Sequence, residues 1–146
     1  MTYSLARGTQ RQHSAQAYAN IGLETEVFSA SPQHLITLLF NGAHAAILKA
    51  KLHMESNNIE GRGMAISKAI DIVDSGLKAS IDLKSGGELA TNLVATYELI
   101  IRNLLLANLN ADIDKLALAE RLLVDISSAW RIAVDPRIDA PSGQTA

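Results

Sequence analysis

The sequence predicts an all-α protein: an antiparallel, up-down four-helix bundle with a flexible N-terminal arm. Alanine and leucine dominate the composition, whereas valine is scarce and aromatic residues make up only 4%. This composition favours helices, because β-branched and aromatic residues are the types that sheets prefer. Apolar residues also recur at helical spacing in successive segments, and short polar breaks separate these segments. A length of 146 residues suits one domain with a substantial core.

The first helix is predicted to begin at Ser31, which can cap it, with Pro32 in the first turn. Apolar residues then follow at alternating steps of four and three, the pattern of one buried face: Ile36, Phe40, Ala43, Ile47, Ala50 and Met54. A second apolar stripe lies beside it: Leu35, Leu38, Leu39 and Ala46. A helix that is apolar on two sides is predicted to be central in the bundle or covered by something else.

Three further helices follow, each after a polar break. Residues 56–58 separate the first helix from the second, whose predicted buried face is Ile59, Gly63, Ile66, Ile70, Val73, Leu77 and Ile81. Paired glycines predict a turn at residues 84–87, and a third helix, apolar on all but a narrow face, is predicted from about residue 88 to 108. Because the three connections are short, each helix is predicted to run antiparallel to its predecessor.

The fourth helix is predicted to follow a break at residues 110–112 and to stop near Val134, because Pro136 disfavours helical geometry for the residue before it. Its predicted buried face is Leu116, Ala119, Leu123, Ile126, Trp130 and Ala133. The bundle is thus expected to occupy residues 31–135. A disordered tail is expected at 136–146 and a flexible arm at 1–30, where Ala17, Tyr18 and Ile21 form a short apolar patch.

The composition argues against several classes of function. A net charge of −2 without a basic cluster predicts no nucleic-acid binding. The chain has no cysteine, and no glutamate is followed three residues later by histidine, as a di-iron bundle requires. We therefore expect no catalytic residue, no cofactor and no metal. The longest apolar stretch, residues 35–48, is shorter than a membrane span, and the first residues lack the apolar core of a secretory signal.

Two glycines, Gly42 and Gly76, lie inside predicted helices, where each costs about 1 kcal/mol relative to alanine. Two explanations are open. Either two helix backbones approach closely there, or the glycine forms a shallow spot in a groove that a partner's backbone can enter.

Several segments resemble the flagellar secretion chaperone family FliS, in the family's order from about residue 15 to 132. The first two are residues 16–21 (Gln-Ala-Tyr-Ala-Asn-Ile) and residues 29–43, which include Ser-Pro-Gln-His-Leu-Ile. The others are residues 66–73 and 86–93, Tyr97, residues 107–109 and the pair Ala129-Trp130.

The resemblance implies a four-helix chaperone of the bacterial cytoplasm. Such a protein is expected to bind the disordered C-terminal segment of flagellin, which folds into helices around the bundle and is kept from polymerising prematurely. It is also expected to deliver flagellin to a gate component of the flagellar type III export apparatus. The family's arm, matched by Ala17 and Tyr18, is expected to compete for the flagellin groove.

The predicted partner-binding residues combine this resemblance with the apolar stripes. Leu38, Gly42, Ile66, Ile70, Val73 and Leu77 are predicted to line grooves, with Ala17, Tyr18 and Ile21 as a movable cover. An alternative is a helical-bundle regulator that sequesters another secretion or transcription factor through the same grooves. The sequence leaves a homodimer open as well.

Overall fold

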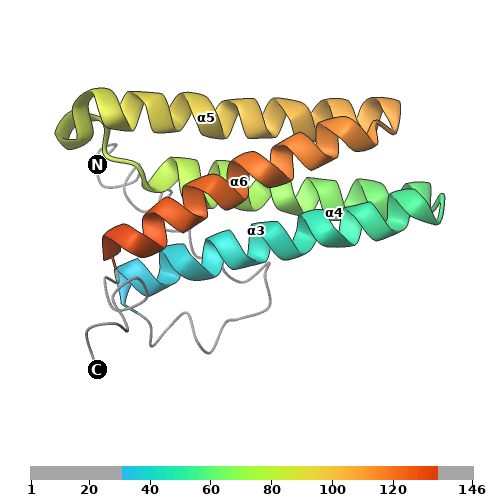
Figure 1. The fold of residues 1–146 in the computed structure, drawn as a ribbon, viewed down its shortest axis with the longest axis horizontal. Coiled ribbons are helices and arrows are strands. Elements are labelled where there is room, and N and C mark those ends of the chain that lie inside the picture. The colour runs from blue at the N-terminus through green and yellow to red at the C-terminus, as the bar shows by residue number, and fades with distance from the viewer. Residues whose placement is uncertain (1–30, 135–146) are drawn as a thin grey trace, which may run out of the picture.

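The computed structural model describes residues 31–134, which form a bundle of four long helices (Figure 1). These are α3 (Pro32–Glu55), α4 (Ile59–Asp71), α5 (Leu83–Asn110) and α6 (Ile113–Val134). A π-helical segment, η1 (Ile72–Leu77), and a 3₁₀ turn, η2 (Lys78–Ser80), continue from α4. The predicted all-α bundle is confirmed, and no strand occurs within residues 31–134. The predicted arm and tail lie outside the described residues.

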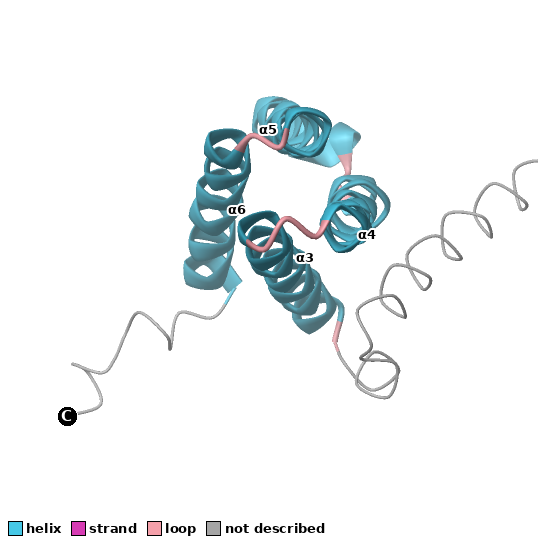
Figure 2. Ribbon diagram, turned by 90° about the vertical axis from the view of Figure 1, so that its right-hand side faces the viewer, coloured by secondary structure: helices cyan, strands magenta, loops and turns pink. Residues whose placement is uncertain are grey.

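Short connections make successive helices antiparallel, and the view along the bundle shows α3 between α4 and α6, with α5 across from it (Figure 2). The Ser31 hydroxyl caps α3 by accepting a hydrogen bond from the His34 backbone N–H at 3.1 Å, as the sequence predicts. Both apolar stripes of α3 are largely buried, because neighbours cover two of its sides: Leu38, Leu39, Phe40, Ala43, Ala46, Ile47 and Ala50 are core residues. The expectation that this helix is central is therefore confirmed.

The second helix is less regular than its periodicity predicts. Asn58 caps α4, accepting from the Gly61 N–H at 2.9 Å, and ordinary α-helical geometry ends at Asp71. The π-helical turn that follows takes an extra residue, so it shifts the phase of the buried face. Consequently Ile72, which the α-helical pattern leaves outside the core face, is buried together with Val73. Gly76 lies buried inside this turn.

The third helix starts earlier than predicted. The Asp82 carboxylate accepts hydrogen bonds from the backbone N–H groups of Lys84 and Ser85 at 3.0 and 3.2 Å, and so caps a first turn that begins at Leu83. Bonds from Ser85 and Lys84 hold the pKa of Asp82 below its ordinary value. Gly87 (φ 57°, ψ −135°) then interrupts the helix, as expected where paired glycines predict a turn. The predicted turn is therefore a capped helical turn with a kink at its end.

The core lies between the four helices and is almost entirely aliphatic, with Tyr97 buried among leucine, isoleucine and alanine side chains. Burial raises the pKa of Tyr97 above its ordinary value. Trp130, predicted to be core, is half-buried at its edge: its ring centre lies 6.4 Å from that of Phe40, and its Nε1–H donates to Thr37 Oγ1 at 3.1 Å. This contact joins the end of α6 to the start of α3.

By length and composition alone, α3 and α5 are long and apolar enough to cross a membrane. The expectation from the sequence rested only on the stretch at residues 35–48, which is shorter than a membrane span. In the bundle, 39% of the most apolar window of α3 and 28% of that of α5 are buried. Core helices of bundles pass the same test, so this property is weak evidence for a membrane span. Because only 28% of the most apolar window of α5 is buried, much of the apolar surface of α5 faces outward.

The first turns of α4 contain two glycines with different surroundings, and substitution by alanine should separate them. A Cβ at Gly63 would meet nothing closer than the Asn108 side chain at 4.0 Å, so we expect Gly63→Ala to raise the free energy of unfolding by about 0.5–1 kcal/mol. A Cβ at Gly61 would lie 2.6 Å from His53 Nδ1 and 2.9 Å from the Asn58 amide. Gly61→Ala should therefore be less stable than Gly63→Ala by about 1 kcal/mol in urea unfolding. Equal gains for the two variants would contradict this packing.

Candidate interaction surface

Large apolar side chains are exposed on every helix of the described bundle. They are Leu48 and Leu52 on α3, Ile59 and Met64 on α4, Leu83, Leu89, Leu99, Leu105 and Leu109 on α5, and Ile113, Val124 and Ile132 on α6. Single exposed leucines are ordinary in proteins. Here, however, they occur on all four helices of a chain with only 19% charged residues. These side chains offer apolar surface that another polypeptide can cover.

One groove runs between α3 and α4 and has a volume of about 440 Å³. Its floor consists of small residues, namely Gly42, Ala45 and Ala46 from α3 and Gly61 and Ala65 from α4, and its walls carry Lys49, His53, Met64 and Lys68. Side chains this short leave the helix backbones close to the surface, so a partner helix can approach them closely. Gly42 lines this groove, which agrees with the explanation that the glycine forms a shallow spot there. Its contact with a partner stays a prediction.

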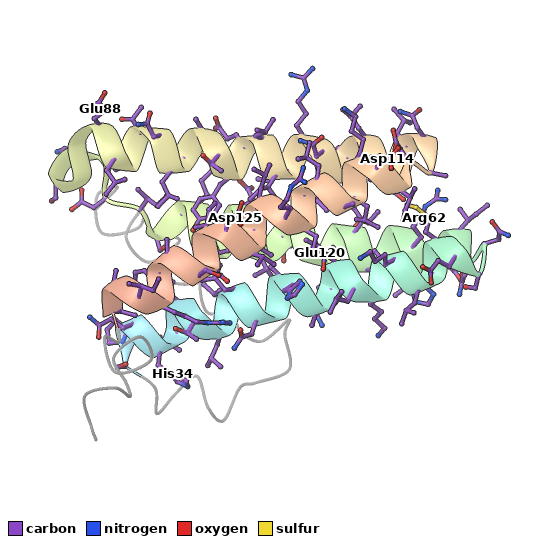
Figure 3. The ribbon with its side chains drawn as sticks, viewed as in Figure 1. His34, Arg62, Glu88, Asp114, Glu120 and Asp125 are labelled. Atoms are coloured by element: carbon purple, nitrogen blue, oxygen red, sulfur yellow. The ribbon has the colours of Figure 1, made fainter. Side chains whose placement is uncertain are left out.

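A second, more open groove of about 720 Å³ lies between the start of α4 and the end of α5. Its lining includes Ile59, Met64 and Leu109. Arg62 crosses between the two helices: its Nε–H donates to Asn108 Oδ1 at 3.1 Å and its Nη2–H to the Asn108 carbonyl at 3.0 Å (Figure 3). The second bond satisfies a carbonyl near the C-terminus of α5, where the helix itself offers no partner. The groove therefore has an apolar rim and a fixed polar link.

Met64 lies on the ridge between the two grooves, since it lines both of them. Its side chain is 70% exposed, and that of Leu109, across the second groove, is 77% exposed. A methionine side chain is flexible and polarisable, which suits a surface that must fit irregular partners. Sequence periodicity missed Met64 and Leu109 as site residues. The available signal was that both are apolar residues lying off the predicted buried faces.

The structure separates the residues that the sequence predicted to bind a partner. Leu38, Ile66, Val73 and Leu77 are core residues, each at most 5% exposed. Ile70 is half-buried against the core. The buried four offer no surface to a partner in this arrangement, because α3 is covered on two sides and the π-helical turn directs η1 inward. Ala17, Tyr18 and Ile21 lie outside the described residues, and the role of the whole set stays a prediction.

A charged contact joins α3 to α6 on another part of the surface. Glu120 of α6 accepts hydrogen bonds from Lys51 Nζ at 2.8 Å and from His44 Nε2 at 2.9 Å (Figure 3). These two partners, Lys51 foremost, hold the pKa of Glu120 below its ordinary value. Among residues 31–134 no group of histidine and acidic side chains is arranged to hold a metal ion. The contact is accordingly a structural link between helices.

This contact should make stability depend on pH. Because the pKa of Glu120 is lower in the folded state, its contribution is present above its unfolded pKa and is lost as the pH falls through the folded one. We expect Glu120→Gln to lower the free energy of unfolding by about 0.5–1 kcal/mol at pH 7. The difference from the unsubstituted protein should shrink below about pH 4.5. Asp125→Asn, at an exposed position on the same helix, is the control and should be near neutral throughout. A difference that is constant from pH 7 to pH 3 would contradict this.

Comparison with known proteins adds to this geometry. The family model described as flagellar protein FliS matches residues 14–137. The chain is 47% identical over 116 residues to the flagellar secretion chaperone FliS of Salmonella typhimurium, covering 80% of this chain and 86% of that relative. It is 44% identical over 126 residues to FliS of Escherichia coli, covering 86% and 88%. It is also 37% identical over 113 residues to FliSB of Pseudomonas aeruginosa, covering 77% and 89%.

Proposed function

We propose that this chain, which belongs to the FliS family of flagellar secretion chaperones, binds the disordered C-terminal segment of flagellin on its exposed apolar surface. A flagellar secretion chaperone has a secreted flagellar protein as its partner, and FliS is a family of chaperones and not of enzymes. The predicted absence of enzymatic activity is therefore confirmed by the family. Flagellin as the particular client, and the bacterial cytoplasm as the place of binding, are parts of the proposal.

The observation that carries the proposal is the distribution of exposed apolar side chains over all four helices. A single groove would suit a single short helix. Apolar positions around the whole bundle suit a long disordered segment that forms several amphipathic helices as it wraps the chaperone. Ordering such a segment costs about 2–5 kcal/mol, and burial of about 1,000–3,000 Å² offsets this cost.

Binding alone is sufficient for the proposed action. A flagellin tail that is folded on the chaperone is withdrawn by mass action from the pool that can polymerise. Release would occur at a gate component of the export apparatus, which we propose as the second partner. Neither step requires a nucleotide or a metal at the chaperone.

Calorimetry combined with circular dichroism tests this function. The full chain is titrated with the C-terminal segment of flagellin from the same bacterium, and an N-terminal flagellin segment of equal length is the control. We expect saturable heat and a gain of helix for the C-terminal segment only. If the C-terminal segment produced no heat and no helix, the proposed client would be wrong.

A further inference from the structure

We propose that the groove between α3 and α4 selects a client helix that presents carboxylates beside an apolar, small-residue face. This inference rests on the proposed function, because it takes the occupant to be one of the helices that the flagellin segment forms on binding. It adds the chemistry by which one particular groove recognises one particular kind of helix.

The walls of this groove carry charge of one sign. Among residues 31–134, its ionisable lining residues are Lys49, His53 and Lys68, and none of its lining residues in this range is acidic. This is a local feature, because the whole chain has a net charge of −2. The groove between α4 and α5, by contrast, is lined by both Glu60 and Arg62. Of these two grooves, charge complementarity therefore favours an acidic occupant for the one between α3 and α4.

The two lysines are not used to hold the bundle together. Two other lysines of the described chain make ion pairs: Lys51 pairs with Glu120, and Lys78 pairs with Asp74 and Glu98. Within residues 31–134, Lys49 and Lys68 form no ion pair or side-chain hydrogen bond. Their charges are thus available to a partner, and little of the bundle's stability depends on them.

The dimensions of the groove fit a helix of about three turns. Its lining on α3 extends from Gly42 to His53, a length of about 16 Å at 1.5 Å per residue. His53 lies against Gly61 at one end, and this antiparallel register sets Lys68 about one helical turn from Lys49 along the groove, on the opposite wall. A helix seated on the glycine and alanine floor would pass between the two lysines.

A small anion fits this groove less well than a helix. The floor is made of Gly42, Ala45, Ala46, Gly61 and Ala65, which provide apolar contact and no side-chain donor. Met64, 70% exposed on the ridge, adds apolar surface beside Lys68 that a free anion would not cover. Apolar floor and cationic walls together match an amphipathic helix with acidic flanks.

The test compares two double variants that change the net charge equally. Lys49→Glu with Lys68→Glu reverses the walls of the groove, whereas Arg102→Glu with Arg121→Glu reverses two exposed cations on α5 and α6. The probes are the flagellin C-terminal segment and versions in which its Asp and Glu residues become Asn and Gln, or Lys. Thermal melts of the full chain show that each variant folds.

We expect the groove variant to bind the natural segment at least about tenfold more weakly, and the control variant to bind it within about twofold of the unsubstituted protein. Raising the salt from 50 to 500 mM should weaken the unsubstituted complex and leave the groove variant nearly unchanged. The lysine-substituted segment should regain affinity for the groove variant.

Two other outcomes overturn the inference and are distinguishable. The inference would be wrong if both double variants weakened binding equally, or if the amide-substituted segment bound as tightly as the natural one. Either result would show that this groove does not recognise the carboxylates of the client, while flagellin remained the client. Failure of the natural segment to bind the unsubstituted protein would overturn the proposed function together with this inference.

Discussion

Replacing Ile66 with alanine is expected to lower the free energy of unfolding by about 2–5 kcal/mol. The side chain is 1% exposed and lies in the main core cluster, so truncation removes apolar contacts and leaves a cavity that the surrounding helices fill only in part. Urea unfolding followed by circular dichroism measures the change directly.

Met64→Ala is the matched control, because Met64 lies two residues earlier on the same helix and is 70% exposed. Its cost should stay within about 0.5 kcal/mol, as for most surface substitutions. If Ile66→Ala cost no more than Met64→Ala, the inner face of α4 would not be the packed core that the structure shows.

Substituting aspartate for both Met64 and Leu109 is expected to weaken the binding of the flagellin C-terminal segment by at least about 30-fold. These two side chains border the groove between α4 and α5, and each is more than two-thirds exposed in the free bundle, at 70% and 77%. Placing a carboxylate at each point would leave an unpaired charge against the apolar face of the client, which is costly. Calorimetry with the double variant gives the change in affinity.

A second double variant, Asn92→Asp with Ser128→Asp, controls for the added negative charge. Both positions are exposed and polar, on α5 and α6, so the substitutions remove no apolar surface. We expect this variant to bind the segment within about threefold of the unsubstituted protein, since isolated surface charges contribute little. If the Met64→Asp, Leu109→Asp variant bound the segment with unchanged affinity, the client would not occupy the groove between α4 and α5.

The helices themselves could be predicted from the sequence because their signals are local. Ser31 and Pro32 mark the start of α3, and the three-four spacing of its apolar residues gives the buried face correctly. The start of α5 at Leu83 was missed, although Asp82 is a typical capping residue, because the glycines that follow were interpreted as a simple turn. The π-helical turn at η1 could not be predicted, since a fixed helical period assumes uniform geometry.

The interaction surface was harder to predict than the fold. An apolar stripe such as the one containing Ile66 and Val73 has the same sequence pattern whether it faces the core or a groove. Only the packing in the structure shows that these two residues face the core. The exposed residues Met64 and Leu109 lie off the regular stripes, where an apolar side chain has no structural role in the bundle. Gly42 could be singled out because a glycine inside a helix requires a reason that propensity cannot supply, and it lines the groove between α3 and α4; its contact with a partner stays a prediction.

The heat-capacity change on binding tests most directly whether the exposed leucine, isoleucine and methionine side chains are what the client covers. Titrations of the full chain with the flagellin C-terminal segment, repeated between 10 and 35 °C, give this quantity as the slope of the binding enthalpy against temperature. Burial of about 1,000 Å² of apolar surface predicts a negative change on the order of 0.5 kcal/mol/K. Tight binding with a heat-capacity change near zero would contradict the account, because the client would then be held without covering that surface.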